Sequence, residues 1–160
     1  MLSFKFICVG KMSDPFYADA ANEYLKRLNG YSKSEIVEIA EHRLPANPSD
    51  AQILIGLDKE QTSILSTIPN GAFTIALCVE GRSLDSIELS ELLFGNTILN
   101  TSKYCFIVGG SHGLHENIKH SANMRLSLSK MTFPHSLARV VLLEQLYRCF
   151  KIAEGSKYHK

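Results

Sequence analysis

Short, nearly continuous apolar runs recur along the chain, and they constrain the fold more than any other feature of the sequence. Stretches with helical spacing of apolar residues separate them. Runs without polar alternation are typical of strands buried on both faces, as in a parallel sheet. The alternation of strand and helix therefore predicts an α/β fold with right-handed crossovers. The runs are Leu2–Val9, Ile36–Ala40, Phe73–Val79 and Tyr104–Val108.

Segments with the apolar spacing of amphipathic helices lie between these runs. Pro15–Leu28 has a proline at its first turn, and Asp14 stands before it as the expected N-cap. Ser49–Leu65 and Ser86–Leu93 follow the same pattern. The 160 residues are 45% hydrophobic and contain neither an internal repeat nor a low-complexity tract. We therefore expect residues 1–160 to form a single domain around one core.

The last predicted helix, His135–Glu154, differs from the others because its middle is apolar on all sides. Val140–Leu143 is an unbroken apolar run, and a helix of this kind is buried around its whole circumference. The terminal helix of a chain this short usually lies at the surface. We therefore expect a second copy of the chain to cover the extra face in an isologous homodimer. A central position within a monomer is the alternative.

Charge is distributed unevenly, although the net charge is only +1. Residues 1–124 contain 10 Lys and Arg against 14 Asp and Glu, whereas residues 125–160 contain 7 against 2. A basic C-terminal segment favours contact with an anionic partner such as RNA or a phosphate-bearing ligand. A solvated basic tail explains the same charges.

Cysteine spacing and hydropathy exclude several classes of protein. The cysteines are far apart and mostly within apolar runs, which is typical of small core residues in a reducing cytoplasm. The sequence has no CxxC pair, His/Cys cluster or HExxH motif, so it does not support a metal site. The apolar stretch Phe6–Val9 is too short for a signal peptide, and no stretch is long enough to span a membrane. We therefore expect a cytoplasmic protein without a metal and without a membrane partner.

Two loops follow predicted strands and suit ligand binding. The strand ending at Val108 runs into Gly109–Gly113, where glycines let the backbone approach a ligand closely. The spacing matches neither the Walker A loop nor GxGxxG, so a plain tight turn remains open. The second loop, Leu128–His135, joins the short predicted strand Met124–Ser127 to the last helix and places hydroxyl groups between apolar side chains. A structural loop in which Pro134 starts the helix fits it equally well.

The C-terminal residues combine groups that suit contact with a nucleic acid base. Tyr158 has a ring that can stack on a base, and His159 titrates near neutral pH. Lys157 and Lys160 add positive charge beside them. A frayed terminus without a function is the alternative.

Motifs stand in order along the second half of the chain at Phe106–Leu114, Leu126–His135, Arg139–Arg148 and Tyr158–Lys160. Together with Val9-Gly10-Lys11 near the start and the overall length, they resemble the RlmH family of SPOUT-class methyltransferases over essentially the whole chain. The resemblance implies a parallel sheet between helices, with a C-terminal part threaded into a trefoil knot that holds the cofactor. Knots are rare exceptions to normal topology, so periodicity alone does not predict one.

The resemblance also implies an activity, which is methylation of N3 of a pseudouridine in 23S ribosomal RNA. S-adenosylmethionine would be the methyl donor, the assembled ribosome the substrate, and the enzyme a homodimer with the target at the subunit interface. The positions that would bind the cofactor are Leu77, Gly109, Leu128, Ser129, Lys130, Met131, Thr132 and Phe133.

The chemistry of this reaction suggests roles for the remaining motif residues. The N3 nitrogen carries a proton that must leave as the nitrogen attacks, which a general base or a nearby cation would assist. His159 is the first candidate for the base, and Tyr158 for stacking or orientation. Arg139 and Arg148 are candidates for holding phosphates or stabilising the developing base anion. His135 competes with His159, with a capping role at the helix start as its structural alternative.

Two other functions remain to be weighed. A generic nucleotide-binding α/β protein is disfavoured because both phosphate-loop fingerprints fail. A ribosome-associated binding module that has lost catalysis is disfavoured because the cofactor-loop positions and the Tyr158-His159-Lys160 tail are filled as in the family.

Overall fold

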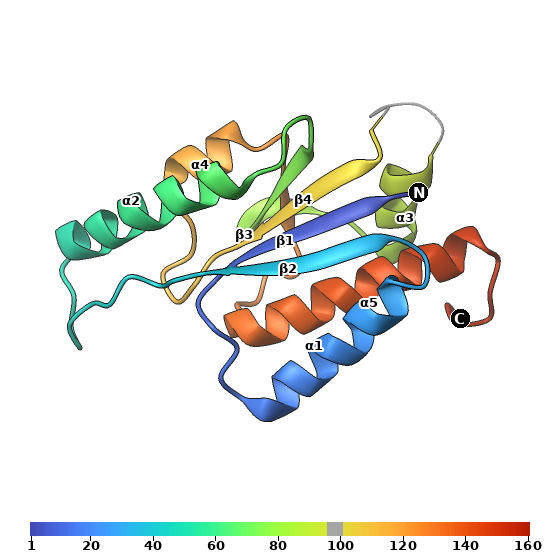
Figure 1. Ribbon diagram of the computed structural model, residues 1–160, viewed down its shortest axis with the longest axis horizontal. Coiled ribbons are helices and arrows are strands. Elements are labelled where there is room, and N and C mark those ends of the chain that lie inside the picture. Colours follow the sequence, from blue (N-terminus) through green and yellow to red (C-terminus); the bar gives the residue numbers. More distant parts are fainter. Residues whose placement is uncertain (96–100) are drawn as a thin grey trace.

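Among the residues that the computed structural model describes, five parallel strands form one sheet in the order β2-β1-β4-β3-β5 (Figure 1). The structure describes residues 1–95 and 101–160. The predicted α/β fold with a parallel sheet is confirmed, and the central strands β1 and β4 are the most deeply buried. The strands are β1 (Ser3–Val9), β2 (Lys33–Ile39), β3 (Phe73–Ser83), β4 (Lys103–Val108) and β5 (Met124–Ser127).

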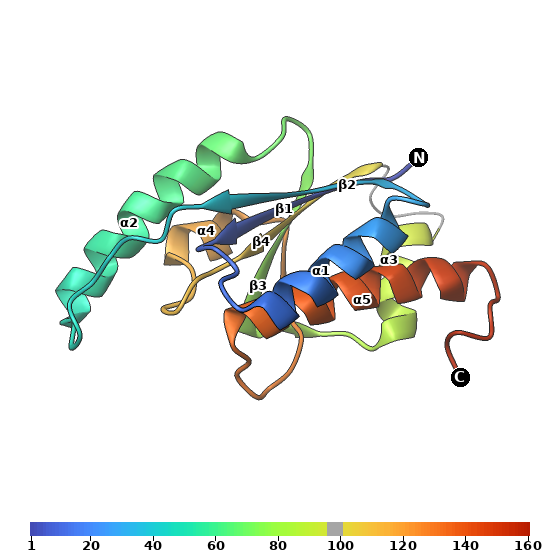
Figure 2. The ribbon, with the colours of Figure 1, turned by 60° about the horizontal axis from the view of Figure 1, so that its bottom comes forward.

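Helices cover both faces of this sheet. Helices α1, α3 and α5 lie on one face, and α2 and α4 lie on the other (Figures 1 and 2). The helices are α1 (Pro15–Leu28), α2 (Asp50–Thr67), α3 (Ser86–Phe94), α4 (Glu116–Ser121) and α5 (His135–Ala153). Ser49 caps α2 in a reciprocal capping box with Gln52. Asp14 stands at the N-cap position of α1 as expected, but its side chain makes no capping hydrogen bond.

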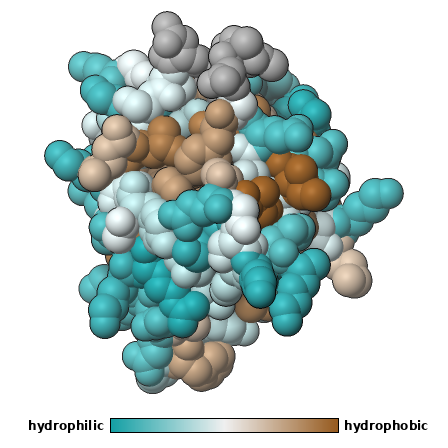
Figure 3. All heavy atoms as spheres, turned by 90° about the vertical axis from the view of Figure 1, so that its right-hand side faces the viewer, coloured by the Kyte–Doolittle hydropathy of each residue, from teal (hydrophilic) through white to brown (hydrophobic). Residues whose placement is uncertain are grey.

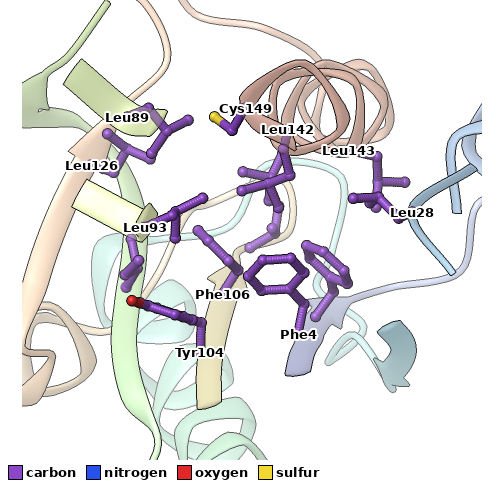
Figure 4. Packing of buried hydrophobic residues seen from close by; sticks show 14 of the residues in the cluster. Phe4, Leu28, Leu89, Leu93, Tyr104, Phe106, Leu126, Leu142, Leu143 and Cys149 are labelled. Atoms are coloured by element: carbon purple, nitrogen blue, oxygen red, sulfur yellow. The ribbon is translucent and has the colours of Figure 1, made fainter. Parts of the chain in front are cut away.

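Alternating side chains of the central strands supply a core on each face. Phe4 and Phe6 of β1 point toward α5, where they pack with Phe106 (Figure 4). Ile7 and Val9 of the same strand point toward α2 and α4. Both faces of these strands are apolar because each is covered by helices, which explains the continuous apolar runs in the sequence.

Strand β3 extends beyond the apolar run that predicts it and contains an irregularity. It pairs with β5 up to Leu77 and resumes pairing at Arg82, so residues 78–81 leave the regular ladder. Such a bulge redirects side chains at the end of a strand. Here it places Cys78, Val79 and Glu80 beside a cavity.

Helix α5 lies between α1 and α3 and is already well covered within one chain. Every residue from His135 to Ile152 is buried or half-buried, with Leu142 and Leu146 fully enclosed. The sheet and two helices of the same chain therefore cover much of the apolar surface of α5. This is the surface from which the sequence predicted a dimer. The dimer and the trefoil knot both stay predictions.

Candidate active site

A cavity of about 640 Å³ lies at the carboxyl ends of β3 and β4. Its walls are the β3 bulge, the loop that follows β4, the loop between β5 and α5, and the first turn of α5. Open parallel sheets bind ligands at this edge, and the volume lies within the roughly 300–1,000 Å³ of small-molecule sites.

The loop after β4 folds back tightly on itself. Gly110 and Gly113 form an isolated bridge, in which the Gly113 N–H donates to the Gly110 carbonyl oxygen at 3.1 Å. A Cβ atom on Gly109 would lie 2.5 Å from the carbonyl oxygen of Gly113, closer than real contacts allow. Position 109 therefore requires glycine, because any side chain there would push this cavity wall out of place.

The loop between β5 and α5 is held by its own hydroxyl groups. The Ser127 hydroxyl donates to the Ser129 carbonyl oxygen at 2.9 Å, and the Met131 N–H donates to the Ser129 hydroxyl at 3.0 Å. The Met131 side chain is 73% exposed at the edge of the cavity. This loop thus presents ordered backbone and an apolar rim to a ligand.

The structure brings together most positions that the resemblance names for cofactor binding. Lys130 belongs to the same loop, but it does not line the cavity. The positions that line it are Leu77, Gly109, Leu128, Ser129, Met131, Thr132 and Phe133.

A group of charged side chains that the sequence reasoning missed lies on the cavity wall. Lys119 of α4 forms ion pairs with Glu80 at 2.6 Å and with Glu116 at 3.0 Å. Burial lowers the pKa of Lys119, but these two partners outweigh it and raise the pKa overall. The hydrogen bond from Lys119 lowers the pKa of Glu80. Both side chains are therefore charged at neutral pH. The sequence signal that could have revealed the bulge is Gly81, a glycine within β3 on which a Cβ would lie 2.7 Å from the backbone of Leu126.

The family model described as "Predicted SPOUT methyltransferase" matches residues 2–159. The ribosomal RNA large subunit methyltransferase H of Streptococcus uberis is 43% identical over 159 residues, covering 99% of this chain and all of the relative. The enzyme of the same name from Bacillus pumilus is 42% identical with the same coverage. This chain belongs to the RlmH family of SPOUT methyltransferases.

Solved structures agree with this family at the level of the fold. A probable methylase family protein from Haemophilus influenzae aligns with a TM-score of 0.51 and 11% identity, over 97% of this chain and 67% of that one. A probable methyltransferase from Bordetella pertussis aligns with the same TM-score and 16% identity, over 91% and 93% of the two chains.

The cavity fits S-adenosylmethionine, the cofactor of RlmH enzymes. Apolar walls such as Leu77 and Phe133 suit an adenine ring, and the tight turn between Gly109 and Gly113 forms another part of the wall. The sulfonium of the cofactor is cationic, and Glu80 supplies a carboxylate on the same wall. When bound, the cofactor supplies an electrophilic methyl group.

In this RlmH chain the predicted catalytic tail packs on the far half of α5. The Tyr158 hydroxyl donates to a Glu144 carboxylate oxygen at 3.1 Å, and Arg148 lies over the Tyr158 ring with Cζ 4.8 Å from its centroid. Arg148 also pairs with Glu144. Burial, followed by the charge of Glu144, raises the pKa of Tyr158 to about 12. Tyr158 is therefore a neutral hydrogen-bond donor in this arrangement and not a base.

His159 is half-buried beside Tyr158, and its Nδ1 atom is enclosed without a hydrogen-bond partner among the residues that the structure describes. Figure 3 shows the end of the molecule where this tail lies, with hydrophilic side chains surrounding smaller hydrophobic areas. His135, by contrast, stands at the first turn of α5 and lines the cavity. Of the two histidines weighed from the sequence, His135 is thus the first residue of α5, whereas His159 lies in the segment after the helix ends.

Arg139 is buried and has partners of its own. Its side chain is 2% exposed and donates to Glu38 at 3.1 Å and to the carbonyl oxygens of Val9 and Gly10 at 2.9 and 2.7 Å. These contacts tie α5 to the carboxyl ends of β1 and β2. In this structure the guanidinium therefore acts on the position of α5 and does not face an RNA phosphate.

Two negative findings apply to the described residues only. No helix among them is long and apolar enough to cross a membrane. They also contain no group of three or more His, Cys, Asp or Glu side chains placed to hold a metal ion.

Proposed function

We propose that the chain transfers a methyl group from S-adenosylmethionine to N3 of a pseudouridine in 23S ribosomal RNA, on the assembled ribosome, as a cytoplasmic homodimer. Full-length similarity to ribosomal RNA large subunit methyltransferase H at 42–43% identity carries the proposal. The cavity formed by the two family loops supports it. The basic segment 125–160, with 7 Lys and Arg against 2 Glu, suits an RNA substrate.

Methyl transfer from a sulfonium is an in-line displacement, so the chain must above all hold the attacking nitrogen near the methyl group. Near-attack contacts are roughly 3–3.5 Å, and precise positioning supplies much of the rate. The ordered loop around Ser129 and the tight turn at Gly109 give the rigid walls that this requires. Met131 is exposed at the rim of the cavity, where its apolar side chain suits contact with a base.

The proton on N3 needs an acceptor, and the candidate residues lie at different distances from the cavity. His135 lies at the cavity of its own chain. His159 and Tyr158 follow the other end of α5. The tail folds back on this helix, so the Tyr158 hydroxyl reaches Glu144, about 14 Å along α5 from His135. In our proposal His159 accepts the proton and Tyr158 orients the base from the second subunit, because within its own chain Tyr158 is held on Glu144 and does not line the cavity. Arg148 stays with this tail group, whereas Arg139 positions α5.

A two-fold dimer would bring the tail of one chain to the cavity of the other. Helices α1 and α5 lie side by side on one face (Figure 2). They leave Phe16 exposed and Val140 and Val141 half-buried. These apolar side chains are suitable for an isologous contact.

Methyl transfer to ribosomes tests the proposed activity. Labelled S-adenosylmethionine and ribosomes that lack the modification should give one methyl group per ribosome with the wild-type protein. Ala138→Trp, which fills the cavity from the first turns of α5, should abolish both transfer and calorimetric binding of the cofactor. Replacing Gly109 would be less informative, because the new side chain collides with Gly113 and disturbs the loop itself.

The control is Ala153→Trp, an exposed position at the far end of the same helix, which should leave cofactor binding intact. Cofactor binding without any transfer to ribosomes would favour the binding-module alternative.

A further inference from the structure

One carboxylate reaches across the carboxyl ends of three neighbouring strands. Glu41 follows the end of β2, and its Oε1 accepts a hydrogen bond at 3.0 Å from the N–H of Ser111, in the loop after β4. Strand β1 lies between β2 and β4 in the sheet. The hydrogen bond spans 70 residues of sequence and therefore links the ends of two strands that do not pair with each other.

The end of β1 leaves space for this carboxylate because a glycine stands there. Gly10 follows β1 directly, and a Cβ atom on it would lie 3.3 Å from Glu41 Oε2, which is tighter than most real contacts. The backbone φ of +86° at Gly10 disfavours other residues as well. The motif Val9-Gly10-Lys11 thus has a structural reason, since its glycine lets the Glu41 side chain pass across the end of β1.

Gly110 leaves space for the same carboxylate at the end of β4. A Cβ atom on Gly110 would lie 2.6 Å from Glu41 Oε1, closer than real contacts allow, and 3.2 Å from Val9 Cγ1. Gly110 does not have a positive φ. The neighbouring side chains, Glu41 above all, therefore account for glycine at this position, and the backbone conformation does not.

Glu41 holds a wall of the cavity from the side that faces away from it. Gly110 and Ser111 line the cavity, whereas Glu41 and Val9 do not. A side chain at position 110 would consequently point to the outer side of the loop. The hydrogen bond has a charged acceptor, which strengthens it, but it is exposed to solvent, which weakens it. We therefore expect a moderate effect of this contact on the loop.

We propose that Glu41 is a positioning residue that fixes the glycine loop of the cofactor site, and that position 110 is glycine to admit this carboxylate and not to admit the cofactor. The inference rests on the proposed binding of S-adenosylmethionine in this cavity. The loop is attached to β4 and closed by the bridge between Gly110 and Gly113. Glu41 adds a restraint from β2. Without it the cofactor must order this wall as it binds, which costs affinity.

Calorimetric titration of S-adenosylmethionine tests the positioning role. Glu41→Ala should weaken binding about three- to ten-fold, because it removes one solvent-exposed hydrogen bond to a charged acceptor. Glu41→Gln keeps an acceptor oxygen for the Ser111 N–H and should bind within about two-fold of the wild type. The matched control is Glu91→Ala, which removes an exposed carboxylate of α3 and should bind as the wild type does. A folded Glu41→Ala variant with wild-type affinity would overturn the positioning role.

A double-mutant cycle tests why position 110 is glycine. Gly110→Ala should weaken binding about as much as Glu41→Ala, because the new methyl group displaces the carboxylate from the Ser111 N–H. In the Glu41→Ala background the same substitution should weaken binding by less than about two-fold, since the carboxylate is already gone. An equal loss in both backgrounds would mean that the methyl group disturbs the cavity directly, and the proposed reason for Gly110 would then be wrong.

The contact can also be observed without any cofactor. The proton resonance of the Ser111 N–H should move upfield in Glu41→Ala and stay near its wild-type position in Glu41→Gln and Glu91→Ala. An unchanged resonance in Glu41→Ala would refute the contact even if the protein binds S-adenosylmethionine well. The expected shift in a protein that does not bind the cofactor would instead refute the proposed function, and with it the effect on affinity, while the contact itself would stand.

Discussion

Arg139 shows how burial changes the role that a sequence motif suggests for a residue. A sequence that supplies an arginine near a proposed RNA site suggests a phosphate contact, but here the guanidinium has its acceptors inside the protein. Two of these are the carbonyl oxygens of Val9 and Gly10, at the point where β1 ends. The arginine thus completes the hydrogen bonding of a strand end that the neighbouring strands do not cover.

Replacing Arg139 with methionine should destabilise the protein by about 2–3 kcal/mol, somewhat less than the roughly 3–5 kcal/mol typical of a broken buried ion pair. The expected loss of stability is smaller than for a fully buried pair because the Glu38 side chain is 36% exposed and can be hydrated once Arg139 is removed. Urea unfolding measures the change. The exposed Arg43→Met variant should differ from wild type by less than about 0.5 kcal/mol, and equal stability of both variants would contradict the structural role.

The residues of the site were only partly predictable. The loops that contain Gly109 and Leu128 could be singled out from the sequence, because each directly follows a predicted strand, and the family resemblance then named the two positions. Glu41, Glu80 and Lys119 could not, since their places depend on a bulge and on contacts between distant segments. No local sequence pattern predicts that such polar side chains will lie at or beside the cavity.

Among the elements, the strands and helices were predictable because buried strands and capped helices have distinct apolar periods. The α1 boundaries agree with the sequence pattern, while α2 runs two residues beyond Leu65, to Thr67. The strand order was not predictable, because it follows from pairing between segments far apart in sequence. The bulge after Leu77 was missed, although Gly81 within the strand is a signal for it. The bulge matters most, since it forms one wall of the cavity.

We expect that the tail after α5 is needed for methyl transfer but not for cofactor binding. Deleting Tyr158–Lys160 should leave S-adenosylmethionine affinity unchanged, because the cavity lies at the other end of the helix. Methyl transfer to ribosomes should be lost. Calorimetry and the transfer assay measure the two properties on the same preparation. Lys157→Ala is a milder control, and a truncated protein that still methylates ribosomes would remove the tail from the mechanism.

Considered as a whole molecule, the chain has its cavity at the first turns of α5, whereas the C-terminal tail follows the other end of this helix (Figure 1). The proposed site uses both, and in the proposed dimer it is therefore formed by two chains. Mixing Ala138→Trp with the tail-deleted protein, each inactive alone, should restore about a quarter of wild-type transfer, since half of the randomly assorted dimers contain one complete site of two.

Light scattering at micromolar concentration checks the mass required for this complementation, and a monomer there would contradict the dimer. Failure to recover activity in a mixture that does form dimers would show instead that cavity and tail act within one chain.

Helix α5 connects these two ends without interruption. An inserted residue in a helix turns everything beyond it by about 100° and advances it by about 1.5 Å. A single insertion between His135 and Ala153 would therefore leave both functional ends chemically intact while pointing the tail in a new direction. In the proposed dimer, the length of α5 is thus under the same constraint as the side chains at its ends, because a longer or shorter α5 would direct the tail away from the cavity of the second chain.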